Sequence, residues 1–231
     1  MRELPELRDR TFVFRDRREA GEVLRRMLEG QLPAGAKILA IPAGGVPVAV
    51  PLAEALKLPL ALAVVSKVAP SWNSEVGYGA VAFDGRVRLD AKSMARLGVD
   101  EREARNGVER TLAKVRQRVR SLSEGSQAVV GPGDTAVLVD DGLASGFTMT
   151  IAIEAVREAG AGRVIVAVPT GSESAVNRVA SSADEVYCAN VRTGWSFAVA
   201  DAYENWSDVD DATLLDMLKQ LRLSRARSIN G

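Results

Sequence analysis

The sequence contains no histidine and only one cysteine among its 231 residues. The absence of histidine excludes a Ser-His or Cys-His catalytic pair, a His-Asp base and an H-E-x-x-H zinc site. A single cysteine excludes an internal disulfide bond and every metal cluster that needs several cysteines. Because Cys188 follows the apolar residues Val186 and Tyr187, we expect it to be a buried structural thiol.

The sequence also lacks a long hydrophobic run and a net charge. The longest uncharged stretch, residues 38–53, is interrupted by prolines and glycines and is shorter than the ~20 residues of a membrane-spanning helix. Residues 1–5 lack the apolar run of a signal peptide. The 30 basic residues balance the 30 acidic ones, which argues against a nucleic-acid partner. We therefore expect a cytoplasmic protein with no membrane partner.

The first part of the chain predicts helices and strands in alternation. Apolar residues make up 47% of the sequence and charged residues 26%, as in an ordinary globular protein. The spacing of apolar residues predicts helices over 17–30 and 46–57 and strands over 37–41 and 60–66. Both strands are continuously apolar, which is typical of a parallel sheet covered on both faces.

The middle of the chain has a different pattern. Asp84 and Gly85 separate two short apolar runs, 81–83 and 87–89, and predict a hairpin. Asp100 is the expected N-cap of a long helix over 101–122. One face of that helix is basic, and the neutral chain favours a solvated surface over a nucleic-acid patch there. The basic residues are Arg102, Arg105, Arg110, Lys114, Arg116, Arg118 and Arg120.

The second half repeats the alternation of strand and helix and leads to a prediction of fold class. Strands are expected at 136–139, 163–168 and 185–189, helices at 146–159 and 172–180, and a last helix near 209–223 with Asp208 or Asp210 as its cap. Such βαβ units predict an α/β fold with a mainly parallel twisted sheet and helices on both faces.

Two adjacent aspartates, Asp140 and Asp141, follow a predicted buried strand and precede a loop of small residues, 142–148. In open α/β sheets, ligands bind beyond the carboxyl ends of the strands, and a helix N-terminus attracts anions. Ionised carboxylates only accept hydrogen bonds, so ribose hydroxyls are natural partners for the two aspartates. The segment therefore favours a ribose 5-phosphate site over a plain acidic strand end with a helix cap.

The segment Val137 to Thr148 resembles the phosphoribosyl pyrophosphate (PRPP) signature of type I phosphoribosyltransferases. The resemblance extends over roughly residues 12–220, which are similar to a bacterial and archaeal group of predicted phosphoribosyltransferases. The segments that carry it are 14–17 with Ala20 and Gly21, 41–49, Lys67 with Asn73, Glu75 and 79–81, and the region of Tyr203 with Asp211. It implies the type I fold with a small hood and a flexible loop that contains the hairpin.

The resemblance also implies site residues, a cofactor and partners. Ribose 5-phosphate would contact Asp140, Asp141, Gly142, Leu143, Ala144, Ser145, Gly146, Phe147 and Thr148, and pyrophosphate would contact Ala43, Gly44, Gly45 and Lys67. Asp140, Asp141 and Lys67 are the candidate catalytic residues, with Asp141 the first candidate for a base. Mg²⁺ is the implied cofactor, held mainly by PRPP and water and by no direct protein ligand. The partners would be PRPP and an unidentified acceptor, and the resemblance leaves a homodimer open.

The chain departs from this group at two positions near the expected pyrophosphate. The group usually has arginine where this chain has Ala43, and Arg-Lys where it has Ser66 and Lys67. A charge-assisted hydrogen bond is worth ~1.5–3 kcal/mol, so we expect weaker PRPP affinity or altered chemistry.

We expect one phosphoribosyltransferase-like domain over 1–231, with its core at about 21–67 and 100–189. Residues 68–90 would form a lid with the hairpin, and residues 1–20 and 190–231 a hood. Trp72 and Tyr78 either stack on a base or pack the hairpin. The aromatic residues of the tail form either a wall of the acceptor site or a small local core, and they are Trp195, Phe197, Tyr203 and Trp206.

The sequence thus supports two functions of different classes. The first is a Mg²⁺-dependent transferase that moves a phosphoribosyl group from PRPP to a nitrogenous base or related acceptor and releases pyrophosphate. The alternative is a PRPP- or nucleotide-binding regulatory protein with weak or no catalysis, and the uncharged Ala43 and Ser66 favour that alternative.

Overall fold

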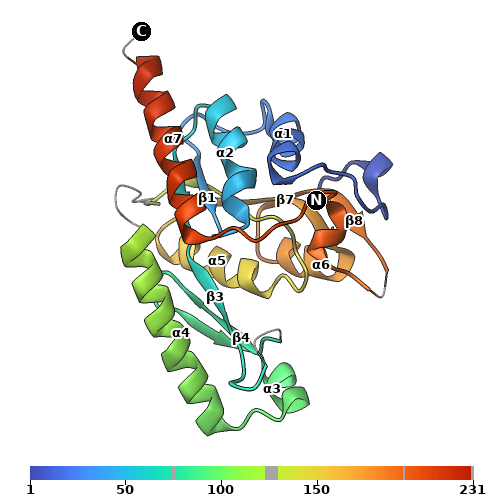
Figure 1. Ribbon diagram of the computed structural model, residues 1–231, viewed down its shortest axis with the longest axis vertical. Coiled ribbons are helices and arrows are strands. Elements are labelled where there is room, and N and C mark those ends of the chain that lie inside the picture. Colours follow the sequence, from blue (N-terminus) through green and yellow to red (C-terminus); the bar gives the residue numbers. More distant parts are fainter. Residues whose placement is uncertain (74–75, 123–129, 195, 230–231) are drawn as a thin grey trace.

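The larger of two sheets forms the centre of the molecule (Figure 1). The computed structural model describes residues 1–231 except 74–75, 123–129, 195 and 230–231, and leaves the side chains of 225 and 227–229 undescribed. Five parallel strands run in the order β2-β1-β6-β7-β8. They are β1 (Lys37–Ala40), β2 (Leu60–Leu62), β6 (Thr135–Val139), β7 (Arg163–Ser172) and β8 (Glu185–Arg192).

Helices cover both faces of this sheet, as the continuous apolar runs predicted. Successive strand residues face opposite sides. Ile38 and Val137 pack towards α1 (Arg17–Leu28) and α2 (Gly45–Ala55). Leu39 and Leu138 pack towards α5 (Phe147–Glu158) and α6 (Glu173–Ala180). The predicted α/β fold class is confirmed.

The smaller sheet is antiparallel and has the order β3-β4-β5: β3 (Val65–Val68), β4 (Gly79–Ala82) and β5 (Val87–Leu89). The predicted hairpin at Asp84 and Gly85 is its β4–β5 turn. The prediction of one strand over 60–66 is wrong, because the chain changes sheets there. Ala63 still donates to the Ala40 carbonyl at 2.9 Å, whereas Val65 already pairs with Ala82. Apolar continuity alone does not reveal such a change.

Two helices accompany the smaller sheet. The long α4 (Glu101–Leu122) begins after Asp100, whose carboxylate accepts from the Glu103 amide at 2.7 Å, so the predicted cap is confirmed. It packs on β3 and β4 rather than on the larger sheet. The short α3 (Ala91–Leu97) was not predicted. Asp90 caps it, and Gly98 ends it in the left-handed conformation at a φ of 66°.

The strands β7 and β8 extend beyond their predicted ends because the ladder continues through polar residues. Thr170 pairs with Asn190, and their side chains form a buried hydrogen bond of 2.7 Å. The Asn190 amide also donates to the carbonyls of Leu7 and Arg10, which fixes the N-terminal segment beside β8. Cys188 in β8 is fully buried, and burial raises the pKa of its thiol, so the predicted structural thiol is confirmed.

The remaining elements are η1 (Pro5–Leu7), η2 (Val199–Ala202) and α7 (Asp211–Ile229). Asp210 is the cap of α7, because its carboxylate accepts from the Thr213 amide at 2.8 Å. In Figure 1, α7 packs beside α2 and extends past the body of the molecule to the C-terminus. No helix among the described residues is both long and apolar enough to cross a membrane.

Candidate functional site

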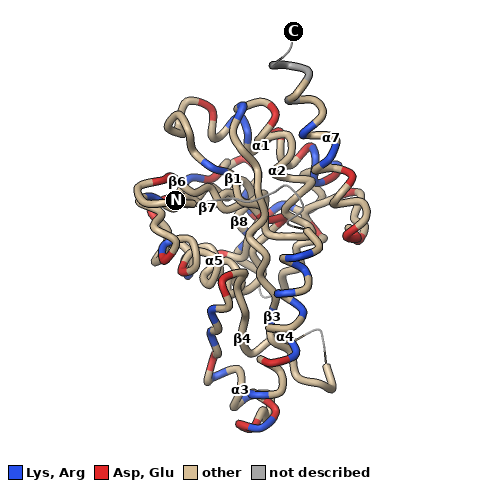
Figure 2. The backbone as a smooth tube through the Cα atoms, turned by 90° about the vertical axis from the view of Figure 1, so that its left-hand side faces the viewer, with Lys and Arg blue, Asp and Glu red and all other residues tan. Residues whose placement is uncertain are grey.

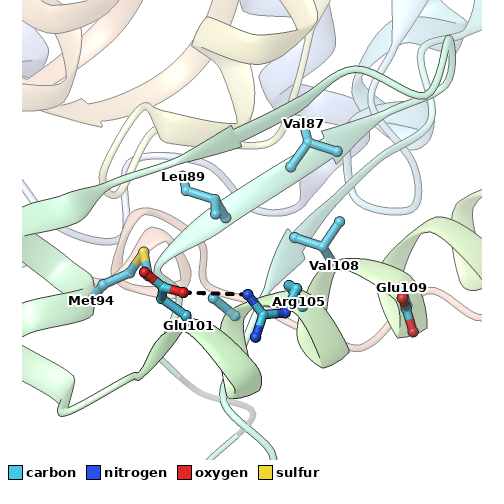
Figure 3. A pocket seen from close by; sticks show the side chains of 8 residues that line it. Val87, Leu89, Met94, Glu101, Arg105, Val108 and Glu109 are labelled. Atoms are coloured by element: carbon cyan, nitrogen blue, oxygen red, sulfur yellow. Dashed lines mark hydrogen bonds and ion pairs between the residues drawn. The ribbon is translucent and has the colours of Figure 1, made fainter.

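The surface has two hollows of interest, and the first is apolar. It has a volume of about 460 Å³ and lies between β5, α3 and α4 (Figure 3). Val87, Leu89 and Val108 line it, and the Arg105–Glu101 ion pair of 3.4 Å lies at its edge on the surface of α4. Two of its three charged groups, Arg105 and Glu101, thus pair along the helix, and the third, Glu109, lies further along α4.

The second hollow is a cleft of about 700 Å³ between the two sheets, and it brings together most of the predicted site. From the larger sheet it contains Asp140 and the whole loop 142–148, and from the smaller sheet Lys67 of β3. It lies beyond the carboxyl end of β6, where ligands of open α/β sheets bind. Polar groups that converge on a large cleft mark this as the candidate functional site.

The predicted phosphate loop is held by the extended end of β7. The Leu143 amide donates to the Thr170 carbonyl at 2.9 Å, and the Leu143 carbonyl accepts from the Ser172 amide at 3.0 Å. The Ser172 hydroxyl donates to the Ala144 carbonyl at 2.9 Å. Gly146 follows at the N-cap position of α5 with a φ of 71°, and as a glycine it has no side chain to cap the helix. The carbonyls of Leu143 and Ala144 are thus tied to β7, and the first residues of α5 line the cleft, where a helix N-terminus favours an anion.

The structure separates the two predicted aspartates. Asp140 lines the cleft, and its carboxylate accepts from the Asp141 amide at 2.9 Å. Asp141 is absent from the cleft lining among the described residues. Its carboxylate accepts a hydrogen bond of 2.8 Å from the Arg17 guanidinium, in an ion pair whose side chains are 16% and 9% exposed. Asp141 is therefore poorly placed to take a proton from a ligand in the cleft.

Arg17 contacts a predicted site residue, and the sequence analysis named it only as part of the segment 14–17. Its guanidinium lies 3.8 Å from the centre of the Trp206 ring and donates to the Ser207 carbonyl at 2.8 Å. Tyr203, beside it, donates from its hydroxyl to the Asp141 carbonyl at 2.6 Å. Arg17 follows the α1 cap Asp16, and that position alone does not distinguish it from an ordinary exposed arginine of a first helical turn.

Burial raises the pKa of both aspartates. For Asp140, burial comes first and the neighbouring Asp141 charge second, and they hold its pKa well above the ordinary range. For Asp141, burial raises the pKa and the Arg17 guanidinium opposes that rise. Perturbed carboxylates in a cleft are typical of functional sites.

The raised pKa of Asp140 predicts a stability that falls with pH in the absence of ligand. The folded state binds more protons than the unfolded state above about pH 4, so the free energy of unfolding decreases from there through the raised pKa. Asp140→Asn should flatten this profile and raise the stability at neutral pH, as urea denaturation at several pH values would show.

Asp134 provides the matched control at the other end of β6. The Lys37 ammonium lowers the pKa of Asp134, so that carboxylate stabilises the fold above about pH 4 and its contribution is lost on acidification. Asp134→Asn should therefore lower the stability at neutral pH. A loss of stability for Asp140→Asn as well would contradict the assigned direction.

The predicted pyrophosphate loop lies next to Asp141, behind the cleft lining. A Cβ on Gly44 would overlap the Asp141 carboxylate, and one on Gly45 would lie 2.6 Å from the Val139 carbonyl. This close approach requires glycine at both positions. The peptide bond between Pro42 and Ala43 is cis. Of the four predicted pyrophosphate residues, only Lys67 lines the cleft in the described structure.

Some of the aromatic residues named in the sequence analysis pack in the interior, and others do not. Tyr203 is 1% exposed and lies 5.7 Å from Phe14 and 5.3 Å from Trp206, ring centre to ring centre, so it belongs to a local core. Tyr78 is also 1% exposed, and its hydroxyl donates to the Glu103 carbonyl of α4 at 3.3 Å. Trp72 is exposed. Trp195 and Glu75, both named in the sequence analysis, lie outside the described residues.

Comparison with known proteins identifies the family. Residues 35–204 match the family model described as "Phosphoribosyl transferase domain". The chain belongs to this phosphoribosyl transferase family. The match spans the larger sheet, the cleft and both predicted loops, so the sequence resemblance is confirmed.

Relatives of this phosphoribosyl transferase chain agree with the family. A Mycobacterium tuberculosis protein named "Putative phosphoribosyl transferase" is 34% identical over 207 residues, which are 89% of this chain and 46% of that protein. The chain thus spans about half the length of that curated relative. The crystal structure of TT1426 from Thermus thermophilus has a TM-score of 0.73 and 32% identity, and the match covers 90% of this chain and 98% of that one.

The donor set of this phosphoribosyl transferase cleft fits a magnesium ion that arrives with its ligand. The described residues contain no group of three or more Cys, Asp or Glu side chains that could hold a metal by themselves. The cleft offers the carboxylates of Asp140 and Asp90, and magnesium keeps several waters and phosphate oxygens in such sites.

Proposed function

We propose that the protein transfers a phosphoribosyl group from PRPP to a nitrogenous base or related acceptor and releases pyrophosphate. The observation that carries this proposal is the cleft itself, in which Asp140, the loop 142–148 and Lys67 converge beyond the carboxyl end of β6. The family supports phosphoribosyl chemistry in general, and the cleft residues support a ligand with both hydroxyls and phosphate.

Different residues of the site bind different parts of PRPP. Asp140 accepts hydrogen bonds from the ribose hydroxyls, with Asp141 behind it as the second predicted contact. The amides and hydroxyls of 142–148 hold the 5-phosphate. Lys67 holds the pyrophosphate from the cleft, and the loop from Ala43 to Gly45 lies behind the lining as the second predicted contact. Mg²⁺, when bound with PRPP, neutralises charge on the leaving pyrophosphate. The protein mainly positions the reactants and stabilises charge, which needs no histidine.

The parts around the cleft suit a lid and a hood within one domain over 1–231. Val76 and Gly77 of the predicted lid, 68–90, line the cleft, and so does Val199 of the predicted hood. The two hood segments, 1–20 and 190–231, pair through the Phe14–Tyr203 bridge. We infer that the hood supplies the acceptor side and that the lid keeps water from the reactive ribose.

The experiment that tests this function is calorimetry with PRPP and Mg²⁺, followed by a screen of nitrogenous acceptors with detection of released pyrophosphate. We expect PRPP to bind with a Kd below about 1 mM, within the range of enzyme substrates. Pyrophosphate release with one acceptor class would support transfer. Binding without release for every acceptor would support the regulatory alternative, which the uncharged Ala43 and Ser66 favour. No binding at millimolar PRPP would contradict both.

A further inference from the structure

The cleft has a second group of cationic residues, which come from α3 and α6. Lys92 and Arg96 are one helical turn apart on α3, so they share a face of that helix, and Arg178 lies in the last turn of α6. All three line the same cleft as loop 142–148. Figure 2 shows basic positions around α3. Neither the sequence analysis nor the family match assigns them a role.

Both helices contribute residues to the lining of the cleft. The Arg178 charge contributes to the lowered pKa of Asp90, the cap of α3, although the Ser93 hydroxyl bond is the largest cause. The helix α6 packs against the phosphate loop, because a Cβ on Gly146 would lie 3.0 Å from the Ala175 carbonyl and 3.1 Å from Val179. Arg178 is therefore on the helix that packs against the start of α5, and Lys92 and Arg96 line the same cleft from α3.

The charges of this second group are available to a ligand. The three cations line the cleft together with two carboxylates, Asp90 and Asp140, in a chain with no net charge. The Asp90 carboxylate already accepts from the Ser93 hydroxyl at 2.6 Å and the Ser93 amide at 3.2 Å. Among the described residues, the three cations of the group have no carboxylate oxygen within 4.0 Å. A cleft with one sign of charge in excess concentrates ligands of the other sign.

We infer that Lys92, Arg96 and Arg178 form a second phosphate subsite, which binds a phosphate group beyond the 5-phosphate held by loop 142–148. The ligand class is a nucleoside 5′-diphosphate or longer, whose first phosphate occupies the loop and whose second reaches the three cations. The subsite rests on the proposed function, because the ribose 5-phosphate must occupy the loop first.

The test compares AMP, ADP and ribose 5-phosphate by calorimetry without magnesium. AMP and ADP share base and ribose, so their ratio of affinities isolates the second phosphate. We expect ADP to bind on the order of tenfold more tightly than AMP, since each exposed cation contributes modestly. In Lys92→Gln/Arg96→Gln and in Arg178→Gln this preference should fall towards one, while the affinity for ribose 5-phosphate changes less than about twofold.

The control is Arg102→Gln/Lys114→Gln, which removes two exposed cations of α4 outside the cleft lining and should keep the ADP preference. Equal binding of AMP and ADP by the unchanged protein would overturn the subsite. Equal weakening of ribose 5-phosphate and ADP in the variants would also overturn it, because the cations would then serve the same phosphate as the loop. A further outcome is that free pyrophosphate binds together with AMP only when the three cations are intact. That result would show that the phosphate group in the subsite comes from free pyrophosphate and not from the nucleotide. Absence of ribose 5-phosphate binding to any form would instead contradict the proposed function.

Discussion

Asp140→Asn should weaken the binding of ribose 5-phosphate and PRPP by about 10- to 150-fold. The substitution removes the charge that accepts from the ribose hydroxyls, and a hydrogen bond to a charged group is worth ~1.5–3 kcal/mol. The amide that replaces the carboxylate keeps the shape of the side chain. The structure gives no reason for unfolding, because the unliganded carboxylate is destabilised by burial and by the Asp141 charge. Calorimetry with ribose 5-phosphate measures the effect directly.

Asp141→Asn serves as the comparison at the adjacent position. Its carboxylate is turned to Arg17 and away from the cleft lining, so we expect a smaller loss of ligand affinity than for Asp140→Asn. The double variant should abolish ribose 5-phosphate binding with the fold intact by circular dichroism. Unchanged affinity in the double variant would remove both carboxylates from the site.

Arg17→Met should lower the free energy of unfolding by about 3 kcal/mol, in the range found when one partner of a buried ion pair is removed. The variant loses the bond to Asp141, the stack over Trp206 and the bond to the Ser207 carbonyl. It also leaves the Asp141 carboxylate buried without its cation, so the pKa of Asp141 should rise further. The stability loss should therefore grow as pH increases above the ordinary range of aspartate pKa values.

A double-mutant cycle with Asp141→Asn isolates the pair. We expect Arg17→Met/Asp141→Asn to be more stable than the sum of the single changes predicts, with a coupling of about 1–3 kcal/mol in urea denaturation. The neighbouring Arg15–Asp16 pair of 3.1 Å is the control, because Arg15 is 62% exposed. Arg15→Met should change the stability much less than Arg17→Met, because exposed ion pairs contribute little. Strictly additive single changes at Arg17 and Asp141 would show that the pair contributes no coupling.

The fold could be predicted to the extent that one local signal determines each element. The caps Asp100 and Asp210 and the hairpin at Asp84 and Gly85 are local, and each lies where the sequence indicated. The change of sheet at residues 63–64 depends on which partner strand is nearby. A uniformly apolar run does not indicate where such a change occurs. The helix α3 has an Asp cap and a Gly stop but only seven residues, too few for a clear period.

The candidate site shows the same limit. The order of strand, aspartates and small loop is contiguous, so the sequence indicated Asp140 and 142–148, and the structure brings them into one cleft. Arg17 reaches Asp141 across 124 positions, and Arg178 meets α3 across more than 80, so only the folded chain reveals them. Charge balance over the whole chain also concealed the local excess of cations in the cleft.

The smaller sheet is a single continuous insertion in the chain. The polypeptide leaves the larger sheet once, after β2, and returns once, at β6, and β3, β4, β5, α3 and α4 all lie between. One wall of the cleft is therefore encoded by an uninterrupted stretch of sequence, and the ribose loop by another. A recombination event or an engineered exchange of that stretch between relatives would transfer Lys67, Lys92 and Arg96 together while leaving Asp140 and 142–148 untouched. The three cations that this wall contributes to the cleft lining are thus encoded together in one segment of the gene.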